Sequence, residues 1–376
     1  MIKLITKEEF SQYAPPENSQ ALFVYKYIKP FMELGSEKVI ANVRTEPMLL
    51  EIDGTLLPMT KNEAEYENSY VCSLLTHYIT YAKEELDIVG IKGLKFFINP
   101  LLNIFGFIAK LFKINKVVIV NNFMLSTNLY HPLNEKQYHD ILDTLKQKFP
   151  HHLILFRSLN EDYNEAEIKL LSSLKCHKIA SRRVYLLKRE NIKAIHRKTI
   201  KKDRELIEQY NYHFEKGSLE DVPVIKQFYD NLYLGKYSKQ NPAFTEEFYK
   251  NVIGNNLFNA QILKRGNDPK GAYGLFSDGI SITAPIFGYT REDDSYDGFY
   301  RVLSLWSVDL AEQGSKLKIN RSSGVADFKR HRGAVGRTEY SMFFSRHLPL
   351  YRRAFLLVFS SLINKLVLPM MIRKKY

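Results

Sequence analysis

The chain has few cysteines and no recognisable metal-ligand spacing. Its two cysteines, Cys72 and Cys176, are too few for a disulfide framework or a multi-cysteine zinc site in 376 residues. His77 and His131 stand alone in the sequence, so we expect structural or surface roles for them and no bound metal. The N-terminal stretch MIKLITKEEF becomes charged at once and lacks an apolar core. No secretory signal is therefore expected, and the cytoplasm is the simplest compartment.

Familiar catalytic motifs are also missing. The sequence contains no G-x-S-x-G, no H-E-x-x-H and no G-x-x-x-x-G-K-[ST] segment. This argues against a serine-hydrolase elbow, a zincin helix and a phosphate-binding P-loop. Acidic residues are in deficit, with 41 Asp and Glu against 54 Lys and Arg, a net charge of +13. Such a balance favours anionic partners, namely phosphates, nucleic acid, an acidic carrier protein or anionic lipid.

Hydrophobic periodicity predicts alternating strands and helices in both halves of the chain. In the first half we expect strands at 38–46, 47–59, 117–125, 152–158 and 179–188, and helices at 68–86, 134–145 and 164–174. In the second half we expect helices beginning at Ser218 and Thr245, a strand at 260–265, a hairpin at 271–290 turning at Asp278-Gly279, a helix from Phe299 ended by Gly314, and strands at 317–324 and 338–346. The repeated order predicts an α/β chain with a mixed sheet and three segments, 1–190, 191–346 and 347–376.

Four segments of the second half carry a resemblance to a known family. They are HRKTIKKDREL (196–206), LYLGKYSKQNPAF (232–244), the hairpin, and INRSSGVADFKRHRGA (319–334). Their order and residues resemble the GNAT acyltransferases, and more closely the Fem-type and BioF2-like branch. The resemblance implies two GNAT-like N-acyltransferase halves packed together, followed by an amphipathic C-terminal tail.

One segment departs from the ordinary GNAT pattern. Acetyl-CoA-using members carry a pyrophosphate loop, [RQ]-x-x-G-x-[GA], before the central helix, where backbone N–H groups hold the phosphates. The corresponding segment here is TREDDSYDGFY (290–300), which is acidic and would repel a pyrophosphate. The similar start at 330–333 lies after the helix and is followed by Val335 at the small-residue position. We therefore expect a bulkier donor, an acyl group on acyl carrier protein or CoA, and no resident cofactor.

The resemblance implies a set of site residues in the second half. The expected catalytic residues are Tyr237, Ser238 and Asn320. The expected donor- or substrate-binding residues are Lys239, Asn241, Tyr289, Lys329, Arg330, Arg332 and Gly333. The cations near Gly333 suit an anionic donor, although a solvated basic loop has the same composition. Tyr237, Ser238 and Asn241 could orient a carbonyl or an amine, or form ordinary turn contacts before Pro242.

Several other charged and aromatic residues allow two interpretations, a functional role and a purely structural one. Asp293, Asp294 and Asp297 could attract a cationic amine, but they also suit the N-terminus of a helix. Trp306 lies on the apolar face of that helix and is expected in the core. Arg197, Lys201 and Arg204 would share one side of a helix, where they could contact RNA phosphates or an acidic carrier. A solvated face is the alternative.

Two apolar stretches stand out, 94–114 and 347–376. The first contains Pro100, Asn103 and Lys110, which favours a helix lying in a membrane interface over one that spans it; a buried core helix is the alternative. The second has basic residues at both ends and Lys365 in its middle. A central lysine costs about 3 kcal/mol on insertion scales, so we expect an anchor on an anionic membrane surface. The alternative is a helix that packs on its own domain.

These observations lead to one main hypothesis and two alternatives. The main one is a cytoplasmic N-acyltransferase, peripheral to the inner face of the membrane, that passes an acyl group from a carrier thioester to an amine. Its products would belong to lipid or natural-product synthesis. The first alternative is Fem-like transfer of an amino acid from tRNA onto a lipid-linked peptide. The second is a non-catalytic GNAT-like module that binds membrane or RNA.

Overall fold

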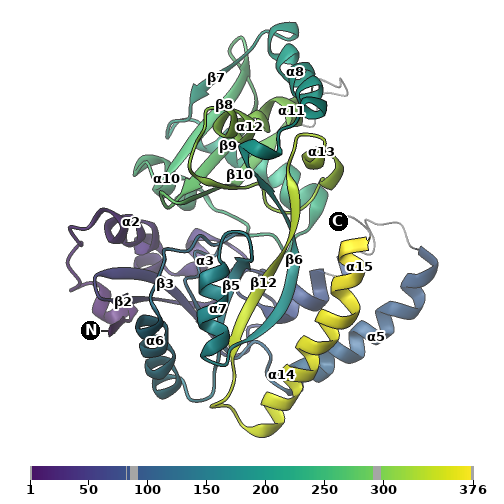
Figure 1. Cartoon of the computed structure of the whole chain (residues 1–376). Coiled ribbons are helices and arrows are strands. Elements are labelled where there is room, and N and C mark those ends of the chain that lie inside the picture. The colour runs from purple at the N-terminus through teal and green to yellow at the C-terminus, as the bar shows by residue number, and fades with distance from the viewer. Residues whose placement is uncertain (1, 82, 85–91, 291–297, 374–376) are drawn as a thin grey trace.

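The computed structural model describes residues 2–81, 83–84, 92–290 and 298–373, and its strands form one mixed sheet (Figure 1). The order of the twelve strands is β1-β2-β3-β4-β5-β12-β6-β11-β10-β9-β8-β7. The strands are β1 (Ile2–Ile5), β2 (Glu46–Ile52), β3 (Thr55–Asn62), β4 (Val117–Val120), β5 (Leu153–Asn160), β6 (His177–Leu187), β7 (Tyr212–Lys216), β8 (Phe258–Arg265), β9 (Asp268–Ser277), β10 (Ser281–Tyr289), β11 (Lys318–Asn320) and β12 (Val335–Phe344).

Helices cover the sheet and fill the connections between strands. The first half contains α1 (Lys7–Phe10), α2 (Ser19–Leu34), α3 (Ser36–Val39), the π-helix η1 (Thr76–Thr80), α5 (Lys92–Leu111), α6 (Glu135–Lys148) and α7 (Glu165–Ser173). The second contains η2 (Arg189–Asn191), α8 (Ala194–Gln209), α9 (Val222–Tyr229), the π-helix η3 (Asp230–Tyr237), α10 (Glu246–Gly254), α11 (Phe299–Leu303), α12 (Leu305–Glu312) and α13 (Ala326–Arg330). The tail forms α14 (Leu350–Leu362), η4 (Ile363–Val367) and α15 (Leu368–Arg373). The chain is therefore α/β with a mixed sheet, as expected.

The last strand in the sequence lies in the middle of the sheet. β12 pairs antiparallel with β6 over Val335–Phe343 and with β5 over Glu339–Phe344. It therefore leaves the second half and completes the sheet of the first, on the far side of β6 from β11. β6 and β12 run through the centre of the molecule and connect its two ends (Figure 1).

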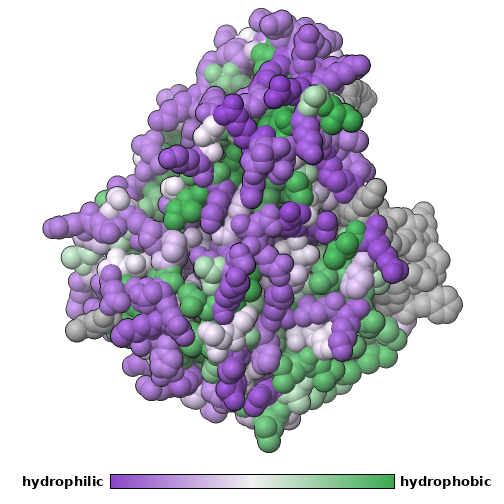
Figure 2. Space-filling model, in the orientation of Figure 1, coloured by the Kyte–Doolittle hydropathy of each residue, from purple (hydrophilic) through white to green (hydrophobic). Residues whose placement is uncertain are grey.

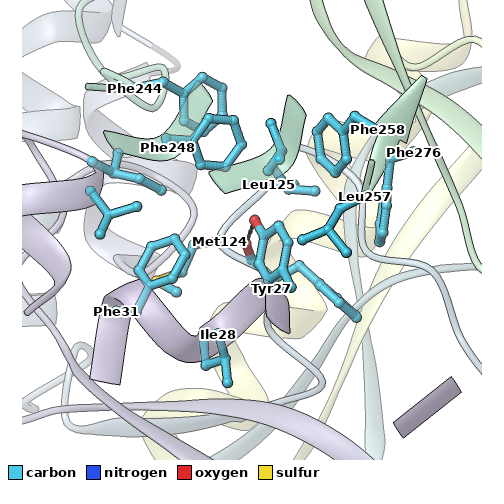
Figure 3. Close-up of a cluster of buried hydrophobic side chains, with 14 of the residues drawn as sticks. Tyr27, Ile28, Phe31, Met124, Leu125, Phe244, Phe248, Leu257, Phe258 and Phe276 are labelled. Carbon is cyan, nitrogen blue, oxygen red and sulfur yellow. Dashed lines mark hydrogen bonds between the residues drawn. The ribbon is translucent and has the colours of Figure 1, made fainter. Parts of the chain in front are cut away.

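An aromatic core joins the two halves. Tyr27 and Phe31 on α2 belong to the same buried cluster as Phe248 on α10 and Phe276 on β9 (Figure 3). The Tyr27 hydroxyl is fully buried and donates a 2.6 Å hydrogen bond to the carbonyl of Phe123. Large aromatic side chains contribute much of the free energy of such contacts because each buries a large apolar area. The two halves thus share one core.

Local signals located several elements correctly. Asn134 caps α6, and Gln137 completes the capping box with reciprocal bonds of 2.9 and 3.0 Å. The hairpin turns at Asp278-Gly279, where Gly279 has φ +84°. Gly314, with φ +77°, follows the end of α12. Trp306 is 7% exposed and packs in the core as expected.

Two predictions for the first half are wrong. The strand expected at 38–46 is helix α3 followed by a loop, because Asn42 hydrogen-bonds the backbone of the second half rather than a neighbouring strand. The strand from Val117 ends at Val120 rather than continuing to Leu125. Asn121 and Met124 adopt φ +55°, which stops the strand.

Two predictions for the second half also need correction. The helix expected at Ser218 starts at Val222 with Asp221 as its N-cap residue, whose carboxylate accepts from the Ser218 N–H and hydroxyl. The single helix expected from Phe299 is divided into α11 and α12 at Ser304.

In the first half, Pro100 does not stop helix α5, which continues to Leu111.

Candidate acyl-transfer site

Two parallel strands of the second half separate and leave an opening in the sheet. β10 and β11 pair at Ser281 with Lys318 and at Ile282 with Ile319. The register of β10 then shifts between Thr283 and Ile286. In the described registers its remaining residues pair with β9, while β11 ends at Asn320 beside β6. The described pairings thus join β10 to β11 only at Ser281 and Ile282, and we call the unpaired region between the two strands beyond Ile282 the opening.

The first half contains a second parallel pair, β4 with β5, which is in register from Val117 with Leu153 to Val120 with Phe156. β4 then ends, while β5 continues to Asn160 against β12. Each half thus has antiparallel strands leading into a parallel pair that separates at its carboxyl end. This repeated arrangement agrees with the two GNAT-like halves that the sequence resemblance predicts.

Comparisons with known proteins give similarity of fold only. No family profile and no curated protein matches the chain. Among solved structures, FemX superposes with a TM-score of 0.49 at 8% identity over 91% of this chain and 96% of that one. L-PGS from Bacillus licheniformis gives 0.44 at 14% identity, covering 61% and 78%. A tandem GNAT protein from the clavulanic acid biosynthesis pathway gives 0.37 at 6%, covering 91% and 98%.

Tyrosines from three elements meet at the opening. Tyr237 on η3, Tyr289 at the end of β10 and Tyr300 on α11 pack against the same apolar cluster around Phe299. The ring centroids of Tyr289 and Tyr300 are 6.4 Å apart. The structure therefore brings together Tyr237 and Tyr289, two of the residues that the sequence suggested.

Close helix packing places η3 against β10. A Cβ on Gly288 would lie 2.3 Å from the carbonyl of Phe228, so only glycine allows this approach. η3 is a π-helix, a rare form that occurs often at functional sites. Its last turn presents Tyr233 and Tyr237, whose rings are 5.8 Å apart. Phe228 lies in α9, which leads directly into η3, so Gly288 determines how near α9 comes to the strand.

Arg321 is a site residue that sequence reasoning missed. It follows Asn320 directly, is 7% exposed, and its Nη1 has no hydrogen-bond partner among the described residues. Burial lowers the pKa of its guanidinium to about 10, so the group stays charged at neutral pH. Its guanidinium carbon lies 5.8 Å from the ring centroid of Phe328. A buried cation with a free donor is suited to an incoming anion or carbonyl oxygen. The sequence places Arg321 inside the strand expected at 317–324, whereas β11 ends one residue before it.

Arg332 stabilises the loop after β11 through buried hydrogen bonds. Its guanidinium forms two hydrogen bonds with the fully buried carboxylate of Asp203, which also binds Arg301 at 2.6 Å. A third bond, 2.9 Å long, goes to the Phe328 carbonyl. Gly333 has φ +86°, and a Cβ there would lie 2.9 Å from the Asn191 carbonyl. Both residues therefore shape the loop in this state of the protein.

Lys329 is also turned inward. Its ammonium group donates to the carbonyls of Arg321, Ser322 and Ser323 at 2.6, 3.2 and 2.7 Å, which occupies its three protons. Burial and the nearby Arg321 hold the pKa of Lys329 well below its ordinary value. Arg330 instead pairs with Asp327 at the surface. Lys329 thus fixes the backbone that carries Arg321.

Asn320 lies at the end of β11, beside the opening, and is 3% exposed. Its Oδ1 accepts a 2.8 Å hydrogen bond from the N–H of Ser322, so its amide shapes the turn into the next segment. In this arrangement Asn320 supports the backbone on both sides of Arg321.

The turn from 238 to 243 connects the two halves. Ser238 donates to the carboxylate of Glu84, and the Lys239 carbonyl accepts from the Asn42 amide at 3.0 Å. Asn241 uses its own amide to close the turn, donating to the carbonyls of Tyr233 and Ser238 at 3.2 and 2.9 Å. The described contacts of this group thus run across the junction of the halves, to Asn42 and Glu84.

A buried polar cluster in the first half was not foreseen. Arg182 on β6 pairs with Glu339 on β12 at 2.8 Å, and Glu339 is 2% exposed. His77 on η1 bonds Ser181 at 2.9 Å. Burial and the charges of Arg157 and Arg182 lower the pKa of His77 to about 3, so it is neutral at physiological pH. The sequence signal was a pair of arginines, 182 and 183, inside a strand.

Two remaining expectations concern charge. Asp293, Asp294 and Asp297 lie outside the described residues. In the basic stripe of α8, Arg204 binds Asp309 and Glu312, each at 2.6 Å. The other two residues of that stripe, Arg197 and Lys201, are exposed to solvent. Lys201 lies 4.0 Å from the Glu205 carboxylate.

Proposed function

We propose that the protein is an N-acyltransferase that moves an acyl group from a carrier thioester, on acyl carrier protein or CoA, to an amine. The observation that supports it is the opening between β10 and β11, with the free donor of Arg321 directly after the strand end. Fixed donors aimed at a polarised oxygen or an anion contribute strongly to acyl transfer in a site that excludes water.

The proposed reaction is a direct attack. The amine nitrogen forms a bond to the thioester carbonyl carbon as the carbon–sulfur bond breaks. The amine loses one proton and the leaving sulfur takes up one, so charge and atoms balance without a covalent enzyme intermediate. In this scheme Arg321 holds the donor, while Tyr237, Tyr289 and Asn320 line the place where the two substrates meet.

Transfer from aminoacyl-tRNA is a second candidate. It is supported by the exposed cations of α8, Arg197, Lys198, Lys201 and Lys202, which suit a phosphate backbone. Both candidates use the same chemistry at the opening and differ in the carrier.

We also propose that the protein works in the cytoplasm at the inner face of the membrane. Among the described residues, one helix, Leu350–Arg373, is long and apolar enough to cross a bilayer by length and composition. Its basic ends and Lys365 support attachment to the surface.

The test uses the purified full chain with acyl-carrier and acyl-CoA thioesters of several chain lengths and a pool of amines. Mass spectrometry follows free thiol and new amide. We expect thiol release that requires amine, a fall of roughly tenfold or more in kcat/KM for Arg321→Gln, and no change for Arg44→Gln, whose side chain pairs with Glu37 at the surface. Turnover only with charged tRNA selects the second candidate. No turnover with either donor contradicts the proposal.

A further inference from the structure

Two helices that are far apart in the sequence lie side by side at one end of the molecule, α5 and the tail helix α14–α15 (Figure 1). Phe112, just after α5, stacks on Phe355 of α14 with ring centroids 4.6 Å apart. Phe105 and Phe359 make a second contact at 6.2 Å. The guanidinium of Arg352 donates to the Phe112 carbonyl at 3.1 Å, which fixes the start of the tail helix to the end of α5. The two helices are therefore packed together as one element.

The outer side of this pair is strongly apolar. The described residues include fifteen large hydrophobic side chains that are exposed, and four of these lie elsewhere: Leu34, Ile195, Leu219 and Val325. The other eleven are Leu101, Ile104, Phe107, Leu111, Leu350, Tyr351, Val358, Leu366, Val367, Met370 and Ile372. Figure 2 shows hydrophobic residues gathered over this corner of the molecule. A concentrated apolar surface of this kind marks an interaction site rather than ordinary surface.

The charges that the two helices themselves carry have one sign. The sequence contains no Asp or Glu between residues 92 and 134 and none after Glu339. Exposed cations accompany both helices: Lys110, Lys113, Arg346, Lys365 and Arg373. A Lys or Arg near an anionic bilayer contributes about 1 kcal/mol to binding. The complementary partner is therefore apolar and negatively charged, as an anionic lipid surface is.

The inner side of the tail helix is bound to the protein. Leu356 and Phe359 are buried in a core that includes strand residues of β4, β5 and β12. The Asn364 side chain accepts from the Ala180 N–H at 2.8 Å and donates to the Lys178 carbonyl at 2.7 Å, both on β6. A helix tied to a soluble sheet along one face cannot be surrounded by lipid. The two alternatives for the tail thus combine, since it packs on its own domain and still exposes an apolar face.

We propose that α5 and α14–α15 form one composite docking surface that lies on a bilayer containing anionic lipid, parallel to its plane. The surface adjoins the segment that lines the junction of the halves, because Lys83, next to Glu84, donates to the side chain of Asn103 on α5. This docking surface rests on the proposed membrane location. It adds α5 to the tail helix as a second element in contact with the bilayer. Docking would hold the junction near lipid-borne substrate.

Vesicle co-sedimentation of the full chain tests the composite surface. Phe107→Glu alters α5, Met370→Glu alters α15, and Ile195→Glu on α8 is the matched control, since Ile195 is also exposed. We expect wild type and the control to bind phosphatidylcholine vesicles containing phosphatidylglycerol and to bind pure phosphatidylcholine poorly. Phe107→Glu and Met370→Glu should each lose roughly tenfold or more in affinity, because an apolar side chain that would enter the bilayer is replaced by a charge.

Three results would overturn the inference. Wild-type binding by Phe107→Glu, with loss in Met370→Glu, would make the tail a lone anchor. Equal binding to both kinds of vesicle would remove the role of anionic lipid. A wild-type dimer that Phe107→Glu turns into a monomer, without vesicle binding, would make the surface an interface between copies. Circular dichroism checks folding, and the vesicle-free thioester assay separates the two proposals: binding without turnover by wild type leaves docking intact and contradicts the transferase.

Discussion

Arg332 and Asp203 form a buried ion pair that ties the loop after β11 to helix α8, 129 residues earlier in the chain. Asp203 is 0% exposed and also accepts from Arg301. Removal of the carboxylate would leave buried guanidinium charge without a partner. We expect Asp203→Asn to lower the free energy of unfolding by about 3–5 kcal/mol, measured by urea denaturation. Asp162→Asn, which breaks a surface pair with Arg337, should cost less than about 1 kcal/mol. Equal losses in both would show that burial does not strengthen the inner pair.

Asn42 connects the two halves through its side chain. Its amide donates to the carbonyls of Lys239 and Asn241 at 3.0 and 2.8 Å and accepts from the Ala243 N–H at 2.8 Å. We expect Asn42→Ala to destabilise the protein by about 2–3 kcal/mol, because three backbone groups lose their partner. The same change should lower turnover, since the turn that follows Tyr237 would shift. Asn259→Ala, on the exposed side of β8, is the control and should leave both quantities unchanged.

His77 makes stability depend on pH. Its pKa is about 3 in the folded protein, against about 6.5 in an unfolded chain. The unfolded state binds more protons between these values, so stability is complete above about pH 6.5 and declines as the pH falls toward 3. From about pH 7.5 to about pH 5.5 this one group should remove about 1 kcal/mol. His77→Asn should reduce that loss in urea titrations at the two pH values. An unchanged slope in His77→Asn would show that His77 does not titrate in this way.

The residues that could be placed from sequence are those whose signals are local. The capping box at Asn134, the turn at Gly279 and the glycine after α12 each depend on a few neighbouring residues. The strand expected at 38–46 failed because Asn42 finds its partners about two hundred residues later. Long-range pairing of this kind leaves no periodicity in the sequence.

The residues of the candidate site also divide into those that local sequence signals locate and those that depend on long-range contacts. Tyr237 and Tyr289, predicted from the sequence, pack against the same apolar cluster, and their roles stay predictions. Lys239 and Asn241 are predicted with them, yet their carbonyls accept from Asn42 of the first half, and the Asn241 amide closes its own turn. Arg321 is not predicted, because its importance depends on a buried Nη1 that has no hydrogen-bond partner among the described residues, and that property is set by the whole surrounding fold. The acyl donor and the amine stay predictions.

The position of β12 also bears on how the chain is made. β5 and β6, both complete by residue 187, are separated by a strand that ends at Phe344. During synthesis the first half therefore emerges with two unpaired strand edges, and it waits for almost the whole remaining chain before they are covered. Unpaired edges invite aggregation, so nascent chains of this protein should depend on chaperones until the last strand leaves the ribosome.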